Sequence, residues 1–227
     1  VPDSVSGNAK DRVSAFQQEI SENHPGVSIA ETIYMDQIDE LKRAAAAEQL
    51  GVSAEELTTW TAEAAGEQTA IEEAETVADG TDGDEDTSEN ISEEARTRLE
   101  DIDSIAGRMS DEDAIVYYLE KHPDLKGCFG TNDETVLLGA QALKSMEKTE
   151  DIVMMGFDAG KDQLSALSDG SIDGLVVQNP FGMGYATVVA AARTALEIGN
   201  EAQVDTGFVW VDAENMEDES IQPMLYE

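Results

Sequence analysis

The sequence predicts an α/β fold, with a mostly parallel, twisted sheet that has helices on both faces. Short apolar runs typical of strands alternate with helical patterns from residue 111 to residue 211. Three of these runs stop at a polar residue just before a helical pattern begins, at Asn132, Asp158 and Gln178. The hydrophobic content of 41% is sufficient for a packed core. This alternation indicates βαβ units joined by right-handed crossovers.

The first elements of the chain come before this alternation. Residues 7–22 have apolar side chains at helical spacing, and the turn at residues 24–26 (His-Pro-Gly) ends that helix. Residues 27–35 are expected to form a strand. Asp36 is the expected N-cap of a second helix, which should end near Leu50. The later strands are predicted at residues 126–131, 152–157, 172–178 and 204–211. The later helices are predicted at residues 111–121, 134–146, 161–168 and 182–199.

An acidic insertion separates the two parts, at about residues 51–108. Residues 44–95 contain sixteen acidic side chains and no Lys or Arg, which marks a change of composition on both sides. Ser53 and Glu56 form the pattern of a capping box, and this pattern predicts a helix up to residue 78.

The end of the insertion has a partial calcium signature. Residues 79–94 include eight acidic side chains and are expected to form a solvated loop. The positions that match an EF-hand-like loop are Asp82, Asp84, Asp86, Asn90 and Glu93. Thr87 replaces the Gly that the sharp turn of such a loop requires. Since chance matches are common in so acidic a stretch, no metal site is predicted.

Composition disfavours several classes of function. The 50 acidic and 13 basic residues give a formal net charge of −37, which repels phosphate backbones and disfavours nucleic-acid binding. Such a surface suits salt-rich surroundings, where counterions screen it. No apolar run is long enough for a membrane span. Cys128 is the single cysteine of the chain, so an internal disulfide is excluded, and we expect Cys128 to be a buried structural thiol. The two His residues fit neither a zinc site nor a catalytic triad, and no cofactor is predicted.

The three strand-end residues are the candidate binding residues. Parallel strands present their carboxyl ends at one edge of the sheet, where open α/β sheets bind ligands. Asn132, Asp158 and Gln178 have planar ends with several hydrogen-bonding positions, which suit the hydroxyl groups of a sugar. Arg12 is expected to face the same edge and offers five N–H donors. Each residue alone could be structural: Asn132 a helix cap, Asp158 a turn former and Arg12 a surface ion-pair partner. Their equivalent positions favour a shared site.

Several stretches resemble the type I periplasmic sugar-binding proteins, the ribose-binding and related receptors of ABC importers. These stretches are SGNAKDRVSAF, FGTNDETVLLGA, MGFDAG, QNPFGMGY and VDTGFVWVDAENMEDESIQPMLYE. The resemblance implies a Rossmann-like lobe of the periplasmic-binding-protein type I fold. It also implies that Arg12, Asn132, Asp158 and Gln178 contact the sugar. Met35 matches a position where many relatives have an aromatic ring stacked on the sugar.

The resemblance covers residues 1–50 and 109–227 and implies a division of the chain. Residues 1–178 would form the second ligand-binding lobe, which contains the insertion. Residues 179–227 would cross back to the first lobe and add a C-terminal strand and tail. The chain starts with Val and lacks the first lobe of these receptors, so we expect a processed product or a fragment. In such a fragment the predicted helix at 182–198 would have no sheet to cover.

The implied function is binding and not catalysis. The resemblance implies an extracytoplasmic receptor, periplasmic or lipid-anchored at the outer face of the cell membrane. It would close on a monosaccharide by a hinge motion and deliver it to ABC permease subunits. The sugar-sensing core of a LacI-like transcription regulator resembles the same fold and is the alternative. The stretches QNPFGMGY and ENMEDESIQPMLYE favour the receptor. An enzyme that uses Asp158 as a base would lack a partner group.

Overall fold

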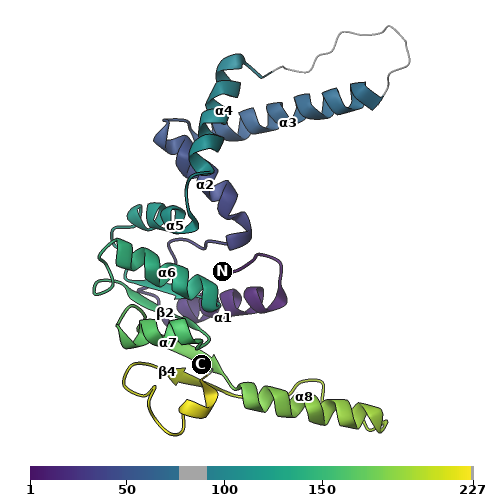
Figure 1. Ribbon diagram of the computed structural model, residues 1–227, viewed down its shortest axis with the longest axis vertical. Helices are drawn as coiled ribbons and strands as arrows, with labels where there is room; N and C mark the ends of the chain where they lie inside the picture. The colour runs from purple at the N-terminus through teal and green to yellow at the C-terminus, as the bar shows by residue number, and fades with distance from the viewer. Residues whose placement is uncertain (77–90, 226–227) are drawn as a thin grey trace. The chain divides into compact units, whose positions relative to one another are not determined.

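The computed structural model describes residues 1–76 and 91–225 of the chain, which form two compact units (Figure 1). Val1–Asp36 and Ile115–Glu227 form the first, called the α/β unit below. Gln37–Ala114 form the second, called the helical unit, whose described elements are helices.

A four-stranded sheet in the order β1-β2-β3-β4 is the centre of the α/β unit. The strands are β1 (Gly127–Gly130), β2 (Val153–Phe157), β3 (Gly174–Gln178) and β4 (Phe208–Val211). The first three pair in parallel, and β4 runs antiparallel to β3. The crossovers are α6 (Asp133–Ser145) and α7 (Lys161–Ser168). The prediction of a mostly parallel sheet with βαβ units is therefore confirmed.

The strand register places apolar side chains on both faces of the sheet. On one face, β2 and β3 pack with α6 and α7 in a single buried core. That core includes Val136, Leu143, Met154, Leu164, Leu167, Leu175 and Val177. Side chains alternate along a strand, so Phe129 of β1 points to the opposite face. There its ring stacks on Phe16 of α1 (Gly7–Asn23), with the ring centroids 4.5 Å apart. Helices thus cover both faces, as predicted.

Helix α6 packs very closely on the sheet. Gly130 and Gly156 are partners across the β1–β2 pair, and the first turns of α6 lie against them. A Cβ atom at Gly156 would lie 2.1 Å from Val136 Cγ2 and 2.5 Å from the Gly130 carbonyl oxygen. The absence of side chains at these two positions lets the helix and sheet backbones approach each other.

The last part of the α/β unit contains α8 (Pro180–Ala195) and a short 3₁₀ turn, η2 (Gln222–Met224). Asn179 caps α8, and its side-chain oxygen accepts a hydrogen bond from the Gly182 N–H. No residue of α8 is buried, although the helix is strongly apolar. Phe181, for example, is 78% exposed. The helix therefore presents apolar surface along its whole length.

Two predictions for the segment before the helical unit are wrong. Residues 27–34 have no regular secondary structure and do not pair with β1. The backbone of this segment bonds to the first residue of the chain instead: the Val1 ammonium donates to the Ile33 carbonyl, and the Met35 N–H donates to the Val1 carbonyl. Asp36 is not the helix N-cap. It lies in η1 (Met35–Gln37) and accepts hydrogen bonds from the N–H and hydroxyl of Ser4, which lower the pKa of its carboxyl group.

The helical unit has a core of its own. It contains α2 (Ile38–Gln49), α3 (Ala54–Thr76) and α4 (Glu93–Ala106), and the start of α5 (Asp111–Glu120). Their buried side chains form a cluster separate from the sheet core. It consists of Ala46, Ala47, Val52, Ile91, Ala95, Leu99, Ile102 and Ala106. The capping box predicted at the start of α3 is confirmed: the Glu56 N–H donates to the Ser53 hydroxyl oxygen, and the Ser53 N–H and hydroxyl donate to the Glu56 carboxylate.

Helix α4 was not predicted. Ile91 is buried, and the Ser92 hydroxyl caps α4 by accepting from the Ala95 N–H, so the end of the predicted loop at 79–94 is ordered into a helix start. Glu93 is the first residue of α4. The other four positions of the calcium signature, Asp82, Asp84, Asp86 and Asn90, lie outside the described residues.

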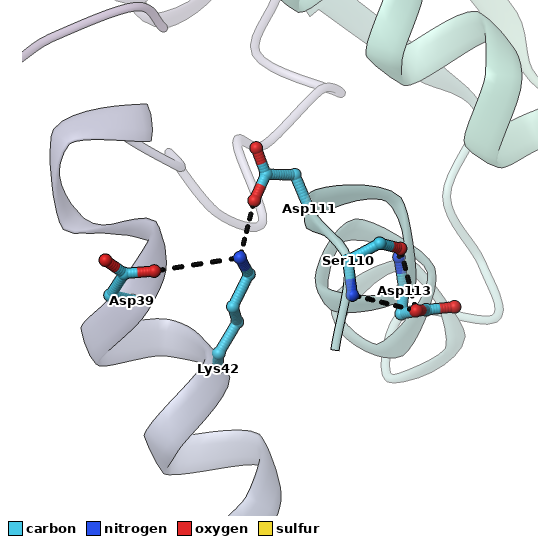
Figure 2. Close-up of polar contacts among 5 residues, drawn as sticks. All are labelled: Asp39, Lys42, Ser110, Asp111 and Asp113. Carbon is cyan, nitrogen blue, oxygen red and sulfur yellow. Dashed lines mark hydrogen bonds and ion pairs between the residues drawn. The ribbon is translucent and has the colours of Figure 1, made fainter. Parts of the chain in front are cut away.

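An ion pair joins the beginning of α2 to the beginning of α5. Lys42 Nζ lies 2.6 Å from Asp111 Oδ1 and 3.6 Å from Asp39 Oδ1 (Figure 2). The Lys42 side chain is 13% exposed. The hydrogen bond from Lys42 to Asp111 raises the pKa of Lys42, and the negative charges of Asp111 and Asp39 add to this effect. In the same view the Ser110 hydroxyl and the Asp113 carboxylate cap the start of α5 reciprocally.

Candidate functional site

Asp158 and Gln178 lie side by side at the carboxyl ends of β2 and β3. The Gln178 Nε2 donates a hydrogen bond of 3.0 Å to Asp158 Oδ1. Both side chains are half-buried. The second oxygen of Asp158 has no hydrogen-bond partner among the described residues, so it is available as an acceptor. The structure thus brings together two of the residues that the strand-end pattern singled out.

Asp158 has an unusual backbone conformation. Its φ of 77° lies in the left-handed region, which non-glycine residues seldom adopt and which Asp tolerates better than most. Its N–H donates to the Val176 carbonyl of β3, at 3.0 Å. Such conformations cost about 1–3 kcal/mol and are concentrated at binding and active sites. The backbone here gives the carboxylate a direction that an extended strand residue would not have.

Arg12 of α1 lies against the ends of β1 and β2. Its Nη1 donates to the carbonyl oxygen of Thr131, just after β1. Its guanidinium carbon lies 4.1 Å from the ring centroid of Phe157, the last residue of β2. A cation over an aromatic face is attracted by the ring quadrupole. Arg12 forms no ion pair with any described residue, so the alternative of a surface ion-pair partner is not supported.

The aromatic support of Arg12 was not predicted from the sequence. Phe157 contacts Phe129 edge-on, with centroids 5.9 Å apart, and Phe129 stacks on Phe16. The guanidinium therefore lies over Phe157, which is the first of three rings that contact one another in series. Two signals were present in the sequence: Phe16 lies four residues after Arg12 on the same helix face, and Phe157 directly precedes Asp158.

Asn132 is both a helix cap and a candidate donor. Its side-chain oxygen accepts from the Thr135 N–H at 3.1 Å and from the Thr135 hydroxyl at 2.6 Å, which completes the cap of α6. The structural interpretation is therefore correct for the oxygen. The side-chain nitrogen has no partner within the described residues, so its two N–H groups are available to a ligand.

Met35 has no described contact with the other candidate residues. It begins η1 and is half-buried. No hydrogen bond or ring contact within residues 1–76 and 91–225 joins it to Arg12, Asn132, Asp158 or Gln178. A contact between Met35 and the sugar stays a prediction.

The arrangement offers donors and acceptors in close proximity. Arg12 and the Asn132 nitrogen can donate, and Asp158 can accept through Oδ2, while its Oδ1 is held by the Gln178 amide. Each hydroxyl group of a ligand can donate one hydrogen bond and accept another, and so fits such a set. In the described part of the chain, no three His, Cys, Asp or Glu side chains cluster in a way that could hold a metal ion. None of the described helices is both long enough and apolar enough to cross a membrane.

A family described as periplasmic binding protein domain matches residues 63–200, more than half of the chain. The chain belongs to this periplasmic binding protein family. The matched region contains Asn132, Asp158 and Gln178, whereas Arg12 and Met35 lie before it. The family resemblance stated from the sequence is therefore confirmed.

Curated relatives of this periplasmic binding protein domain include sugar import proteins. The ribose import binding protein of Bacillus subtilis is 37% identical over 73 residues, which are 32% of this chain and 23% of that protein. The D-apiose import binding protein of Paraburkholderia graminis is 32% identical over 82 residues, which are 36% of this chain and 26% of that protein. The chain thus matches about a quarter of the length of these relatives.

The solved structures that this chain resembles include solute-binding proteins of ABC transporters. One from Agrobacterium vitis with bound D-fucose has a TM-score of 0.48 and 17% identity, and the match covers 99% of this chain and 98% of that one. Another from Agrobacterium vitis, bound to alpha-D-tagatopyranose, has a TM-score of 0.47 and 22% identity, with 58% and 50% covered.

Proposed function

We propose that the chain is part of an extracytoplasmic solute-binding protein that binds a monosaccharide and delivers it to an ABC importer. The observation that carries this proposal is the Asp158–Gln178 pair beside Arg12, at the carboxyl edge of a parallel sheet. Membership of the periplasmic binding protein family and the names of the sugar import relatives support it. The role is binding and transport, without chemical conversion of the sugar.

The side chains have complementary roles in the proposed site. Asp158 accepts a hydrogen bond from a sugar hydroxyl through its free oxygen, while Gln178 holds the other oxygen in place. Arg12 donates to hydroxyl or ring oxygens from its fixed position over Phe157. The Asn132 amide donates while its oxygen keeps the helix cap. Met35 contributes apolar surface against the sugar ring.

The proposal assigns residues 1–178 to one ligand-binding lobe and residues 179–227 to the segment that crosses to a second lobe. The exposed apolar side chains of α8 support this assignment, because such a helix normally covers a sheet. The two lobes would close on the sugar by a hinge motion. Hydrogen bonds from both lobes to the sugar would stabilise this closed state, which the permease subunits would recognise.

Isothermal titration calorimetry of the full-length protein that contains these residues tests the proposal. The ligands are D-ribose, D-apiose, D-arabinose and D-fucose. We expect saturable binding of at least one of them and its loss in Asp158→Ala and Arg12→Ala, since each change leaves buried polar groups unpaired at a cost of about 1–3 kcal/mol.

Matched controls remove the same charges elsewhere. Asp162, exposed on α7, and Lys10, exposed on α1, are the control positions. Asp162→Ala and Lys10→Ala should bind as the wild type does. Unchanged affinity in both Asp158→Ala and Arg12→Ala would refute the site, and no binding of any sugar by the wild type would refute the function.

A further inference from the structure

Gln163 is a buried polar residue that the site described above does not use. It lies on the first turn of α7, and only 1% of its surface is exposed. Its Nε2 donates to the Phe157 carbonyl at 2.7 Å, and its Oε1 accepts from the Gly160 N–H at 2.9 Å. Its side chain therefore spans the turn on both sides of Asp158.

The two ends of one peptide group are fixed by these contacts. The Phe157 carbonyl and the Asp158 N–H belong to the same planar peptide unit. Gln163 binds its oxygen, and the Val176 carbonyl of β3 accepts from its N–H at 3.0 Å. Rotation of this peptide would have to break both hydrogen bonds. Such a rotation is the movement that would release Asp158 from its φ of 77°.

The conformation of this turn determines the direction of the Asp158 side chain. With the turn fixed, Asp158 Oδ1 accepts from Gln178 Nε2 at 3.0 Å, and Oδ2 has no hydrogen-bond partner among the residues that the structure describes. A turn that rearranges without these hydrogen bonds would let Asp158 leave its left-handed conformation and would no longer hold the carboxylate in this geometry. Pre-organised binding groups give higher affinity because the cost of ordering them is already met before the ligand arrives.

We propose that Gln163 is a positioning residue for the sugar site, which holds the Phe157–Asp158 peptide and so keeps the Asp158 carboxylate directed at the ligand. This inference rests on the proposed function for its ligand. It assigns Gln163 no contact with the sugar. The usual role of such a residue, the capping of α7 through Gly160, is present as well, so the test must separate the two roles.

Three variants separate positioning from capping. Gln163→Met has a similar size and removes both hydrogen bonds. Gln163→Glu keeps an acceptor for the Gly160 N–H but loses the donor to the Phe157 carbonyl at neutral pH. Leu164→Ala removes a buried apolar side chain from the same helix and leaves the turn intact. We expect affinity for D-ribose, or for the tightest sugar of the panel, to fall about tenfold or more in both Gln163 variants and to stay at the wild-type level in Leu164→Ala.

Thermal unfolding and amide hydrogen exchange complete the experiment in the full-length protein. Leu164→Ala should have the lower thermal stability of the two variants, and Gln163→Met should have the lower affinity for the sugar. If Gln163 only stabilised α7, affinity and stability would fall together. The Asp158 and Gly160 amides should exchange faster in Gln163→Met, while the paired amides of β2 stay protected. Wild-type affinity in both Gln163 variants, an equal loss in Leu164→Ala, or unchanged exchange at Asp158 overturns the inference. If the wild type binds no sugar, the proposed function fails, and the exchange at Asp158 still decides whether Gln163 holds the turn.

Discussion

Replacement of Gly156 by alanine should lower the free energy of unfolding of the α/β unit by about 3 kcal/mol. The new Cβ would lie 2.1 Å from Val136 Cγ2 and 2.5 Å from the Gly130 carbonyl oxygen. Unstrained contacts are about 3.5–4.0 Å, so more than about 1 Å of space must open. The Val136 side chain can rotate, but the Gly130 oxygen belongs to the backbone of the paired strand β1. Overpacking commonly costs about 1–3 kcal/mol, and the displaced backbone places this case at the upper end.

Urea unfolding followed by tryptophan fluorescence measures the effect. Trp60 packs in the core of the helical unit, and Trp210 lies over Gly174 in the α/β unit. In a Trp60→Phe background the fluorescence therefore reports the α/β unit alone. The midpoint should fall while the denaturant slope stays unchanged, because the change affects stability and not the surface exposed on unfolding.

Gly184 provides the matched control. It lies inside α8, and a Cβ there would meet no atom within 4 Å. Gly184→Ala should leave stability unchanged or raise it by up to about 1 kcal/mol, since alanine favours a helix over glycine. If Gly156→Ala changes the unfolding free energy by less than about 0.5 kcal/mol, the close packing of α6 on the sheet is refuted.

Three further predictions concern single side chains. Lys42→Met should destabilise the helical unit by up to about 1 kcal/mol at neutral pH, less in 1 M salt. Asp111 raises the pKa of Lys42 above its ordinary value of 10.5. The stabilisation by Lys42 is therefore fully present below pH 10.5 and is lost as the pH rises through the raised pKa. Urea unfolding followed by Trp60 fluorescence at several pH values measures this loss. Asn132→Asp keeps the cap oxygen and loses the N–H donors, so calorimetry should show about tenfold weaker sugar binding at near wild-type stability; equal affinity would contradict the donor role. Burial raises the pKa of the Cys128 thiol to about 11, so iodoacetamide at pH 8 should label the native protein at least about 100-fold more slowly than the urea-unfolded one.

The sheet could be predicted because its signals are local. Each parallel strand is a short apolar run between a turn and a helix, and the predicted ends of β1, β2 and β3 lie within two residues of the observed ones. The segment at 27–35 has a similar pattern, but its hydrogen bonds go to Val1, a partner that local pattern does not identify. Helix α4 was not predicted because its acidic composition resembles that of residues 79–90 in the sequence, although Leu99 and Ile102 follow helical spacing toward the core.

The candidate site was predictable in part for the same reason. Asp158 and Gln178 end adjacent parallel strands, so topology alone brings them together. The contacts among Phe16, Phe129 and Phe157 depend on the register between β1 and β2 and on the packing of α1 against the sheet. No single stretch of sequence encodes these long-range features. Gln163 was overlooked because its importance comes from the unusual backbone at Asp158.

Arg12 packs on the ring of Phe157 in a chain that has 50 acidic residues and only 13 basic ones. Several basic side chains of this protein have a carboxylate within reach, among them Lys42, Arg43 and Lys144, and a ligand would have to compete with it. A ring face and a backbone carbonyl hold Arg12 instead, and neither is a mobile counter-charge. Added salt weakens exposed ion pairs by screening, whereas contact between a guanidinium and an aromatic face depends far less on ionic strength. The ion pairs at the protein's surface can therefore weaken or strengthen with the salt concentration while Arg12, the proposed sugar donor, keeps its position.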